Sequence, residues 1–368
     1  MADKFLQIDI FDIEGHVSAL KVLMEEGYQI VGVLAAGIDA PETMTTIAKF
    51  LGLPSVETET AHLVHNKHKF REKLKELNYP VPQFVTVSEK DLDRIPELVE
   101  KIGFPLIVKN TDSSGSRGTK IFYENDPQGI ADILKEAIRV SKSGLALIEE
   151  CWEGPEQTVE TIFDVSGKFH PCFITDRIFN RENGYAMEIG LRSPSNLPAA
   201  IQQEMFTVAE NVARDLGIKV GAAKYDMILT PKGPRIIEMT VRLSGGFDCQ
   251  YLTPAATGKN VMKAAILTAL GENFSSALLE NTKNKVGLSE SIWPEPGKIV
   301  EIGGLEEAKN IPGVENIFFR YQLGDIIQPY IDCTKRVCFI IVTGKDEAEA
   351  RLIMDEAKNT ITIKTEPA

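Results

Sequence analysis

The stretch GAAKYDMILTPKGPRIIEMTVRLSGG, residues 221–246, has the pattern of two strands joined by a tight turn. Successive side chains of a strand point to opposite faces, so the second strand turns Glu238, Thr240 and Arg242 toward the same face. That face presents a carboxylate, a hydroxyl and a guanidinium in line. The other face is apolar and is expected to pack in the core through Ile237, Met239 and Val241.

The turn decides which side chains meet across this hairpin. If residues 231–233 form a three-residue loop with Gly233 in the left-handed conformation, Asp226 lies opposite Glu238. Two carboxylates at cross-strand distance repel unless a cation lies between them, and Mg²⁺ prefers carboxylate and phosphate oxygens. Mn²⁺ is the alternative ion. A solvated sheet face would explain the same residues, so the hairpin alone leaves both interpretations open.

A second polar segment, VKNTDSSGSRGTKIF, covers residues 108–122 and lies between two expected strands. No Gly-Lys-Ser/Thr follows its glycines and no helix follows either, so it is not a P-loop. Successive N–H groups of such a loop can bind an anion, and Lys109 at the end of the first strand can reach a phosphate. A mobile polar hairpin tip is the alternative.

The segment ALIEECWEGPEQTVE, residues 146–160, marks the end of another strand. Where a strand runs into a turn, free backbone groups can bind the edge of a purine, and Glu156 can accept hydrogen bonds from ribose hydroxyls. A charged loop between two strands is the alternative. Farther upstream, a metal site at His62, His65 and His68 is disfavoured, because on a helix they spread over roughly 120°.

Composition and charge narrow the class of protein. The 368 residues suggest two or three folded units. The formal net charge of −13 argues against a general nucleic-acid or membrane-surface binder, because both need a positive field. No signal peptide is apparent, and no uncharged apolar run approaches the roughly 20 residues of a membrane helix. The five scattered cysteines form no Cys-x-x-Cys pair, so a reduced, cytoplasmic protein is expected.

Strand and helix patterns alternate at the N-terminus, which predicts a short parallel α/β unit. Its expected elements are strands at 5–10 and 28–35 and helices at 14–27 and 41–52. Mixed patterns after it predict α+β units. They comprise a helix at 62–77, a Pro-rich linker, a small mixed unit at about 80–150, a hairpin at 157–175, a helix at 198–216 and a β-rich unit from about 286.

In this order the segments resemble the ATP-grasp superfamily, most of all its carboxylate–amine ligases of the L-amino-acid ligase type, with relatives in biotin carboxylase and carbamoyl-phosphate synthetase. The resemblance rests on these motifs: HNKHKFREKL before a Pro-Val-Pro linker, GFPLIVKNTDSSGSRGT, ALIEECWEGPEQTVE, the hairpin at 221–246, and a closing unit with EPGKIVEI and KRVCFIIVTG. The resemblance implies an ATP-grasp fold, in which two α+β subdomains grip ATP. The expected domains are a shortened α/β domain at 1–65, the ATP-grasp domain at 66–285 with a lid subdomain at about 80–150, and a β-rich subdomain at 286–368.

The resemblance also implies a role for each matching residue. Lys67 and Lys109 match family lysines that reach the phosphates, and Arg242 matches the arginine that faces the transferred phosphoryl group. Arg192, in the segment 183–198 where the family places a substrate loop, is the expected clamp for a carboxylate or phosphate. The remaining matches are Ser113, Ser114, Gly115 and Ser116 in the loop over the phosphates, Glu149, Glu150, Cys151 and Trp152 in the adenine hinge, Glu156 at the ribose, and Asp226, Glu238 and Thr240 at the metal.

Three features depart from the family pattern. Thr240 stands where Asn is usual, Asp226 stands where Glu is common, and the opening strand–Gly-turn–helix is missing, so the N-terminal domain is expected to be short or truncated. A hydroxyl ligates Mg²⁺ more weakly than an amide oxygen does, which weakens the second metal position.

The function implied is an ADP-forming ligase that joins a carboxylate to an amine through an acyl phosphate. It would use ATP and Mg²⁺, with amino acids as the expected small-molecule substrates, no nucleic-acid or membrane partner, and a homodimer as a compatible assembly. Two alternatives stay open: an enzyme that phosphorylates bicarbonate, as carboxylases and carbamoyl-phosphate synthetases do, and an ATP-binding regulatory protein without catalysis.

Overall fold

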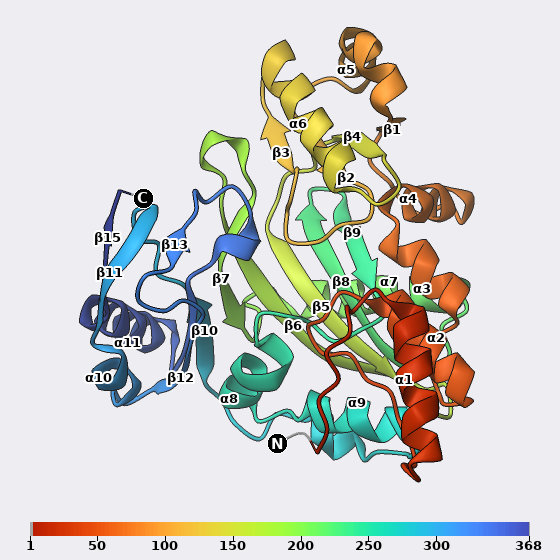
Figure 1. Cartoon of the computed structure of the whole chain (residues 1–368), viewed down its shortest axis with the longest axis vertical. Helices are drawn as coiled ribbons and strands as arrows, with labels where there is room; N and C mark the ends of the chain where they lie inside the picture. The colour runs from red at the N-terminus through yellow and green to blue at the C-terminus, as the bar shows by residue number, and fades with distance from the viewer. Residues whose placement is uncertain (1–2, 368) are drawn as a thin grey trace.

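The structure is a computed structural model that describes residues 3–367. Its strands form three sheets (Figure 1), in the orders β1-β4-β2-β3, β12-β14-β10-β7-β6-β5-β8-β9 and β13-β11-β15. Every strand pair in these sheets is antiparallel. The mixed α and β architecture expected from the sequence is confirmed.

The elements follow one another closely along the chain. The helices are α1 (Ile13–Glu25), α2 (Pro41–Leu51), α3 (Thr58–His65), α4 (Lys67–Glu76), α5 (Ile95–Ile102), α6 (Pro127–Val140), α7 (Ala199–Asp215), α8 (Thr253–Thr257), α9 (Val261–Ala269), α10 (Leu305–Lys309) and α11 (Glu347–Thr360). The strands are β1 (Phe84–Val87), β2 (Leu106–Asn110), β3 (Lys120–Phe122), β4 (Ala146–Glu150), β5 (Glu156–Phe163), β6 (Phe169–Asn180), β7 (Met187–Ser193), β8 (Gly221–Thr230), β9 (Gly233–Thr240), β10 (Val286–Glu290), β11 (Gly297–Gly303), β12 (Val314–Phe319), β13 (Ile326–Ile327), β14 (Cys338–Gly344) and β15 (Thr362–Glu366). None of the helices in the described part of the chain is long and apolar enough to cross a membrane.

The eight-stranded sheet has one fully packed face and one that is partly polar. On the packed face, Ala223, Tyr225 and Met227 of β8 join a core with residues of α3, α4 and α7. The alternate residues Lys224 and Asp226 point to the other face, because side chains of a strand alternate. Helix α9 covers one end of that face, where it packs on β5 and β6. The rest of that face is left for polar side chains.

The β8–β9 hairpin pairs Asp226 with Glu238 as expected, but its loop length and register differ from the prediction. Its loop has two residues rather than three, and Gly233 after it has a left-handed φ of +94°. A bulge at Ile237 supplies the missing residue and restores the register, so that Asp226 lies opposite Glu238. Because of the bulge, Ile236 enters the core in place of Ile237, and the expected assignment of Ile237 to the apolar face is wrong.

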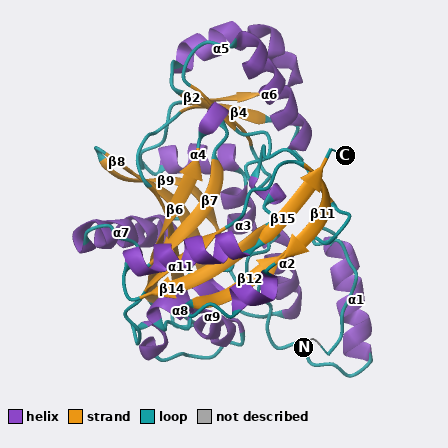
Figure 2. Cartoon of the chain, turned by 90° about the vertical axis from the view of Figure 1, so that its left-hand side faces the viewer, coloured by secondary structure: helices purple, strands orange, loops and turns teal. Residues whose placement is uncertain are grey.

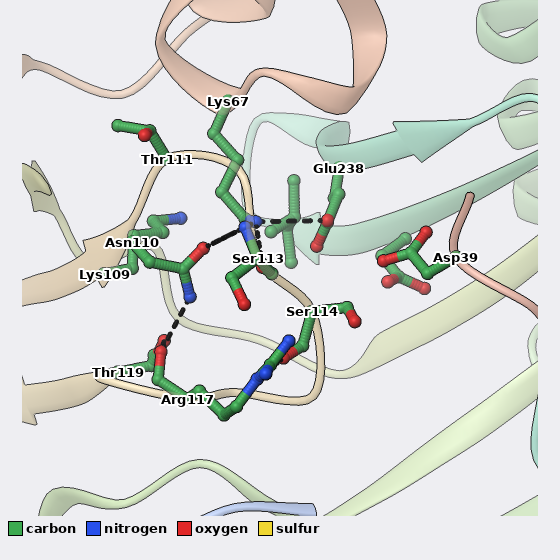
Figure 3. A network of polar contacts seen from close by, with 12 residues as sticks. Asp39, Lys67, Lys109, Asn110, Thr111, Ser113, Ser114, Arg117, Thr119 and Glu238 are labelled. Atoms are coloured by element: carbon green, nitrogen blue, oxygen red, sulfur yellow. Dashed lines mark hydrogen bonds and ion pairs between the residues drawn. The ribbon is translucent and has the colours of Figure 1, made fainter. Parts of the chain in front are cut away.

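The four-stranded sheet and helices α5 and α6 form a small unit with its own core, which we call the lid unit. It lies at the top of Figure 1, above one end of the central sheet. Its loop 111–119, between β2 and β3, runs toward the polar face of β8 and β9 (Figure 3). The lid unit therefore covers the part of the central sheet that carries the predicted carboxylates.

The N-terminal part contains the expected helices α1 and α2 but not the expected strands. Residues 5–10 and 28–35 lie outside any strand, and a single parallel bridge joins Ala36 to Leu243. Parallel strands persist when both faces are covered and several strands pair. Here Val31, inside the second run, is 56% exposed. The prediction of a parallel sheet in this part of the chain is therefore wrong.

The helix expected at 62–77 is two helices. Asn66, with φ −93° and ψ 101°, ends α3 and precedes α4. The break frees the backbone N–H of Lys67, which donates to the carbonyl oxygen of Thr111 in the lid unit at 2.7 Å. The interruption thus fixes the start of α4, and with it Lys67, against the lid unit.

The C-terminal part continues the central sheet and adds a small one. Strands β10, β12 and β14 extend the sheet beyond β7, and α11 packs against β14 and β10. Figure 2, in which this part faces the viewer, shows β11 and β15 paired outside it. The expected boundary at 285/286 precedes a strand that pairs with β7, so the domain boundaries themselves stay a prediction.

Candidate active site

A cavity of about 290 Å³ lies on the polar face of the central sheet, beneath loop 111–119. Strands β7, β8 and β9, that loop, and the C-terminal segment from the short helix η5 (Cys333–Lys335) to β14 all contribute to its walls. The expected site residues that line it are Ser114, Gly115, Ser116, Asp226, Glu238, Thr240 and Arg242. Tertiary folding thus brings together segments that are far apart in the sequence.

Two cross-strand pairs form the floor of the cavity. Asp226 lies opposite Glu238, and Lys224 lies opposite Thr240. Lys224 Nζ lies 2.5 Å from Asp226 Oδ1, and Arg177 Nη1 lies 3.2 Å from the same oxygen. Two cations therefore already contact the Asp226 carboxylate. Thr240 Oγ1, in contrast, is buried without a hydrogen-bond partner among the described residues.

Lys67 connects the floor to the loop above it (Figure 3). Its Nζ lies 3.4 Å from Glu238 Oε1, and it donates to the carbonyl oxygen of Ser113 at 2.9 Å and to Asn110 Oδ1 at 3.4 Å. Burial alone raises the pKa of Glu238, but the charges of Lys67 and Lys224 outweigh it and lower the pKa to about 2. Glu238 is therefore an anion at neutral pH, which is the form that binds metal ions.

Loop 111–119 is fixed at both of its sides. Near its start, Ser113 N donates to Asn110 Oδ1 at 2.6 Å. At its tip, the carbonyl oxygen of Gly115 accepts a hydrogen bond of 3.1 Å from Cys333 N in η5. Two successive residues at the tip have left-handed φ angles. Such turns point consecutive N–H groups in similar directions and are suited to binding phosphate oxygens.

Lys109 and Glu149 form a buried charged group with an arginine that the sequence did not single out. Glu149 Oε2 lies 2.7 Å from Lys109 Nζ, and Glu149 Oε1 lies 3.3 Å from Arg71 Nε. Burial raises the pKa of Glu149, but Arg71 and Lys109 outweigh it and hold the pKa below its ordinary value. The Glu149 side chain thus neutralises and positions the lysine, so any contact of Glu149 with a nucleotide would come from its backbone.

The other residues expected at the adenine hinge lie outside this cavity. The N–H groups of Glu150 and Cys151 donate to the carbonyl oxygens of Gln83 and Pro105. Hydrogen bonds from this segment to an adenine would have to come from other backbone atoms, and Trp152, which follows, is half-buried. The hinge stays a prediction.

Glu156, the expected ribose ligand, is held between two arginines. Arg181 Nη2 lies 2.6 Å from Glu156 Oε1, and Arg177 Nη1 lies 3.3 Å from Oε2. Burial raises the pKa of Glu156 although both arginines lower it. Arg177 also contacts Glu188 through Nε at 2.8 Å, so it joins Glu156 to the cavity wall. The sequence did not indicate Arg177, because it lies on an ordinary alternating strand.

The two arginines predicted as catalytic occupy different environments. Arg242 lines the cavity, and its Nη2 lies 3.4 Å from Asp39 Oδ1. Arg192 does not line it. Its neighbour Leu191 faces the cavity, and strand alternation sends Arg192 to the other side, where its Nε lies 2.9 Å from Glu347 Oε2 in α11. Arg192 therefore lies outside this cavity, and its expected role as a clamp for a carboxylate or phosphate stays a prediction.

Two further cavity residues escaped the sequence analysis. Arg336, from the segment before β14, donates through Nη2 to the carbonyl oxygen of Glu188, and its buried Nε has no hydrogen-bond partner among the described residues. Asp248 accepts hydrogen bonds at Oδ1 from Thr253 and Thr175. Burial raises the pKa of Asp248 to about 7. Arg336 is part of the motif KRVCFIIVTG, to which the sequence assigned no site role, and Asp248 follows the hairpin motif at 221–246. The fold places both at the cavity.

The chain matches two protein families. Residues 66–277 match the family described as carbamoyl-phosphate synthase L chain, ATP binding domain, which is more than half of the chain. Residues 291–366 match L-amino acid ligase C-terminal domain 2. The chain belongs to the ATP-grasp carboxylate–amine ligases.

The individual proteins that this chain resembles are distant from it in sequence. The uncharacterized protein y4rH of Sinorhizobium fredii is 24% identical over 93% of this chain and 70% of its own length. The L-arginine-specific L-amino acid ligase of Bacillus subtilis is 24% identical over 76% of this chain and 67% of its own length. The carbamoyl phosphate synthase large chain of Clostridium acetobutylicum is 25% identical over 59% of this chain, which spans only 19% of that protein.

Solved ATP-grasp structures share the fold. The L-amino acid ligase from Bacillus licheniformis superposes with a TM-score of 0.79 at 21% identity, covering 96% of this chain and 85% of that one. Phosphoribosylglycinamide synthetase from Anaerococcus prevotii superposes with a TM-score of 0.72 at 21% identity, covering 99% and 89%. The expected ATP-grasp fold and the expected class, the ADP-forming ligases that make C–N bonds, are confirmed. Biotin carboxylase from Campylobacter jejuni shares the fold as well, with a TM-score of 0.69 at 18% identity.

ATP-grasp enzymes in general use a divalent cation with ATP, and the floor of the cavity fits such an ion. Glu238 is ionised, and the unpartnered Thr240 Oγ1 lies on the same face of β9 two residues away. Within residues 3–367 no cluster of three or more His, Cys, Asp or Glu side chains could hold a metal alone. An ion here would therefore need phosphate oxygens to complete its shell, as is usual for Mg²⁺ bound with a nucleotide.

Proposed function

We propose that this ATP-grasp enzyme joins two amino acids, or an amino acid and a similar amine, through an acyl phosphate, releasing ADP and phosphate. The observation that carries the proposal is that Lys67 contacts both Glu238, which lines the cavity, and Ser113 of the loop above it. Support for an amino-acid substrate comes from the match of residues 291–366 to the C-terminal domain of L-amino acid ligases.

The reaction would take place in two steps. A carboxylate oxygen of the first substrate attacks the γ-phosphorus of ATP, and the bond to the β–γ bridging oxygen breaks to release ADP. The amine nitrogen of the second substrate then attacks the acyl carbon, expels inorganic phosphate and loses one proton. A carboxylate alone does not react because its leaving group is poor, and phosphorylation corrects this. Catalysis then rests mainly on positioning and on neutralising charge.

This chain supplies both requirements from its own residues. Lys67 and Lys109 would neutralise phosphate oxygens, and Arg242 would face the transferred phosphoryl group and the oxyanion of the second step. Glu238 and Thr240 would hold Mg²⁺, which when bound neutralises charge on the β- and γ-phosphates. The N–H groups of loop 111–119 would cover the phosphates and exclude water, which would otherwise hydrolyse the acyl phosphate.

Asp248 is suited to accept the proton that the amine must lose. It lines the cavity, its Oδ2 is buried without a hydrogen-bond partner among the described residues, and burial raises its pKa to about 7. A carboxylate of that pKa can bind an incoming ammonium group and accept its proton near neutral pH. Glu160 lies deeper, outside the cavity wall, and burial raises its pKa to about 8.

The decisive experiment measures phosphate release with ATP, Mg²⁺ and pairs of amino acids, followed by mass spectrometry of the products. The expected result is ADP, phosphate and a dipeptide mass for at least one pair. Glu238→Ala should abolish ADP formation while leaving the fold intact by circular dichroism. The matched control is Glu204→Ala on α7, which should be fully active. Near-normal turnover in Glu238→Ala would refute the metal assignment.

The same assay distinguishes the alternatives. Bicarbonate-dependent ADP release without any amino acid would indicate a carboxylase or carbamoyl-phosphate type of enzyme, in line with the match of residues 66–277. ATP binding by calorimetry without ADP formation for any acid–amine pair would indicate a regulatory protein.

A further inference from the structure

The Lys224 ammonium lies beside Asp226, a carboxylate that was expected to bind a metal ion with the nucleotide. Its side chain and that of Asp226 are both largely buried, and Nζ lies 2.5 Å from Asp226 Oδ1. Both residues lie on the cavity face of β8, directly across from Thr240 and Glu238. The four side chains are thus neighbours along and across the two strands, and Lys224 carries the positive charge among them.

The contacts of Asp226 converge on one of its two oxygens. Lys224 Nζ, Arg177 Nη1 and the Thr158 hydroxyl all contact Oδ1, at 2.5, 3.2 and 3.4 Å. A divalent ion bound to the same oxygen would lie within a few ångströms of two positive groups. Neither group could leave easily, because both side chains are mostly buried in the floor of the cavity. The Oδ1 side of Asp226 is therefore closed to a metal ion.

On the facing strand β9, the side chains of Glu238 and Thr240 are suited to bind a metal ion. The Glu238 side chain is 38% exposed, and its Oε1 is no closer than 3.4 Å to Lys67 Nζ. The neighbouring Thr240 Oγ1 is buried and unpartnered among the residues described, which costs free energy unless a ligand satisfies it. The chain thus offers one metal position, next to Glu238, and one position that a side-chain cation already fills.

We propose that the Lys224 ammonium takes the place of one divalent ion, so that this enzyme binds ATP with a single metal ion held at Glu238 and Thr240. The inference rests on the proposed nucleotide function and refines it. Lys is suited to the task because its ammonium is a compact point charge with three N–H donors. One donor contacts Asp226, and the other two remain to contact phosphate oxygens. This role of Lys224 would also explain why Asp226 stands where Glu is common in the family, since the longer Glu side chain would leave less room for the ammonium.

The test counts Mn²⁺ ions by electron paramagnetic resonance in the complex with the non-hydrolysable β,γ-imido analogue of ATP. This readout needs no turnover. The wild-type chain is expected to bind one Mn²⁺ per nucleotide. Lys224→Met removes the charge at similar length and is expected to bind two, with the broadening that two nearby Mn²⁺ ions cause. Lys232→Met, at the exposed tip of the same hairpin, is the matched control and should keep one.

Each outcome decides the proposal. Two ions in the wild type, or one ion in a folded Lys224→Met, would overturn the replacement while leaving the nucleotide site intact. If Lys224→Met does not fold, Lys224→Gln with the same ion count as the wild type would overturn it, and a second ion would support it. Absence of nucleotide-dependent Mn²⁺ binding in the wild type would instead refute the proposed function itself.

Discussion

Glu149 is the buried anion that holds Lys109 and Arg71 together, and Glu149→Gln isolates its charge. The side chain is 2% exposed, with Oε2 at 2.7 Å from Lys109 Nζ and Oε1 at 3.3 Å from Arg71 Nε. Gln preserves the size of the side chain but removes the charge. Both cations would then face a neutral amide in a place from which water is excluded.

The magnitude follows from burial. Removing one partner of a buried ion pair leaves an uncompensated charge and costs about 3–5 kcal/mol. The Arg71 and Lys109 side chains are 1% and 8% exposed, so solvent screens little of that cost. In a folded unit of about 200 residues, 1 kcal/mol corresponds to a shift of roughly 2–4 °C in Tm. At the lower cost, Glu149→Gln should lower Tm by about 6–12 °C at pH 7.

The effect should also depend on pH with a defined sign. Arg71 and Lys109 outweigh burial and hold the pKa of Glu149 below its ordinary value. A carboxyl whose pKa is depressed by folding contributes stability above its unfolded pKa, about 4.3, and loses it as the pH falls through the folded pKa. The difference in Tm between the wild type and Glu149→Gln should therefore be full at pH 7 and narrow below about pH 4.

Differential scanning calorimetry over that pH range checks both statements. Glu150→Gln is the matched control, because Glu150 is the next residue along and is exposed. It should leave Tm nearly unchanged. If Glu149→Gln and Glu150→Gln had equal Tm values at pH 7, the charge of Glu149 would contribute nothing, and the interpretation of the buried group would be refuted.

Two further substitutions test the cavity and the loop above it. Asp248→Asn should lower kcat by about 10²–10⁴-fold and remove the decline in rate below pH 7, because the amide cannot accept a proton; an unchanged pH profile would contradict that role. Gly118→Ala should destabilise more than Gly144→Ala in thermal unfolding. Both positions have left-handed φ, which costs about 1 kcal/mol or more for Ala, but only at Gly118 would the new Cβ lie 2.8 Å from the Ala137 Cα. Equal Tm shifts would show that this packing is unimportant.

Local sequence patterns pointed to several of the residues that line the cavity. Strand alternation and loop–strand order drew attention to Ser114, Asp226 and Glu238, and the family resemblance gave them expected roles; all three line one cavity. The reason is that alternation along a strand and loop–strand order are properties of neighbouring residues. The predicted pairing of Asp226 with Glu238 was right although the predicted loop length was not, since the bulge at Ile237 compensated for it.

Local patterns failed where the outcome depended on partners elsewhere in the chain. The runs at 5–10 and 28–35 have strand-like sequences, but they form no strand because nothing pairs with them along their length. Arg192 lies in the expected substrate segment, yet strand alternation and Glu347 in α11 draw it away from the cavity.

The sequence by itself thus indicated the hairpin with Asp226 and Glu238 through short-range order along the chain, and it indicated the ATP-grasp fold and the roles of Lys67 and Lys109 through the resemblance of its motifs to that superfamily. The tertiary structure decided how those charges are paired. Glu149 became a buried counter-ion of Lys109, and Lys224 became the cation on Asp226. Such pairings depend on distances of a few ångströms between side chains on different turns and strands, since electrostatic energy falls with distance and rises as water is excluded. Only folding brings about both conditions.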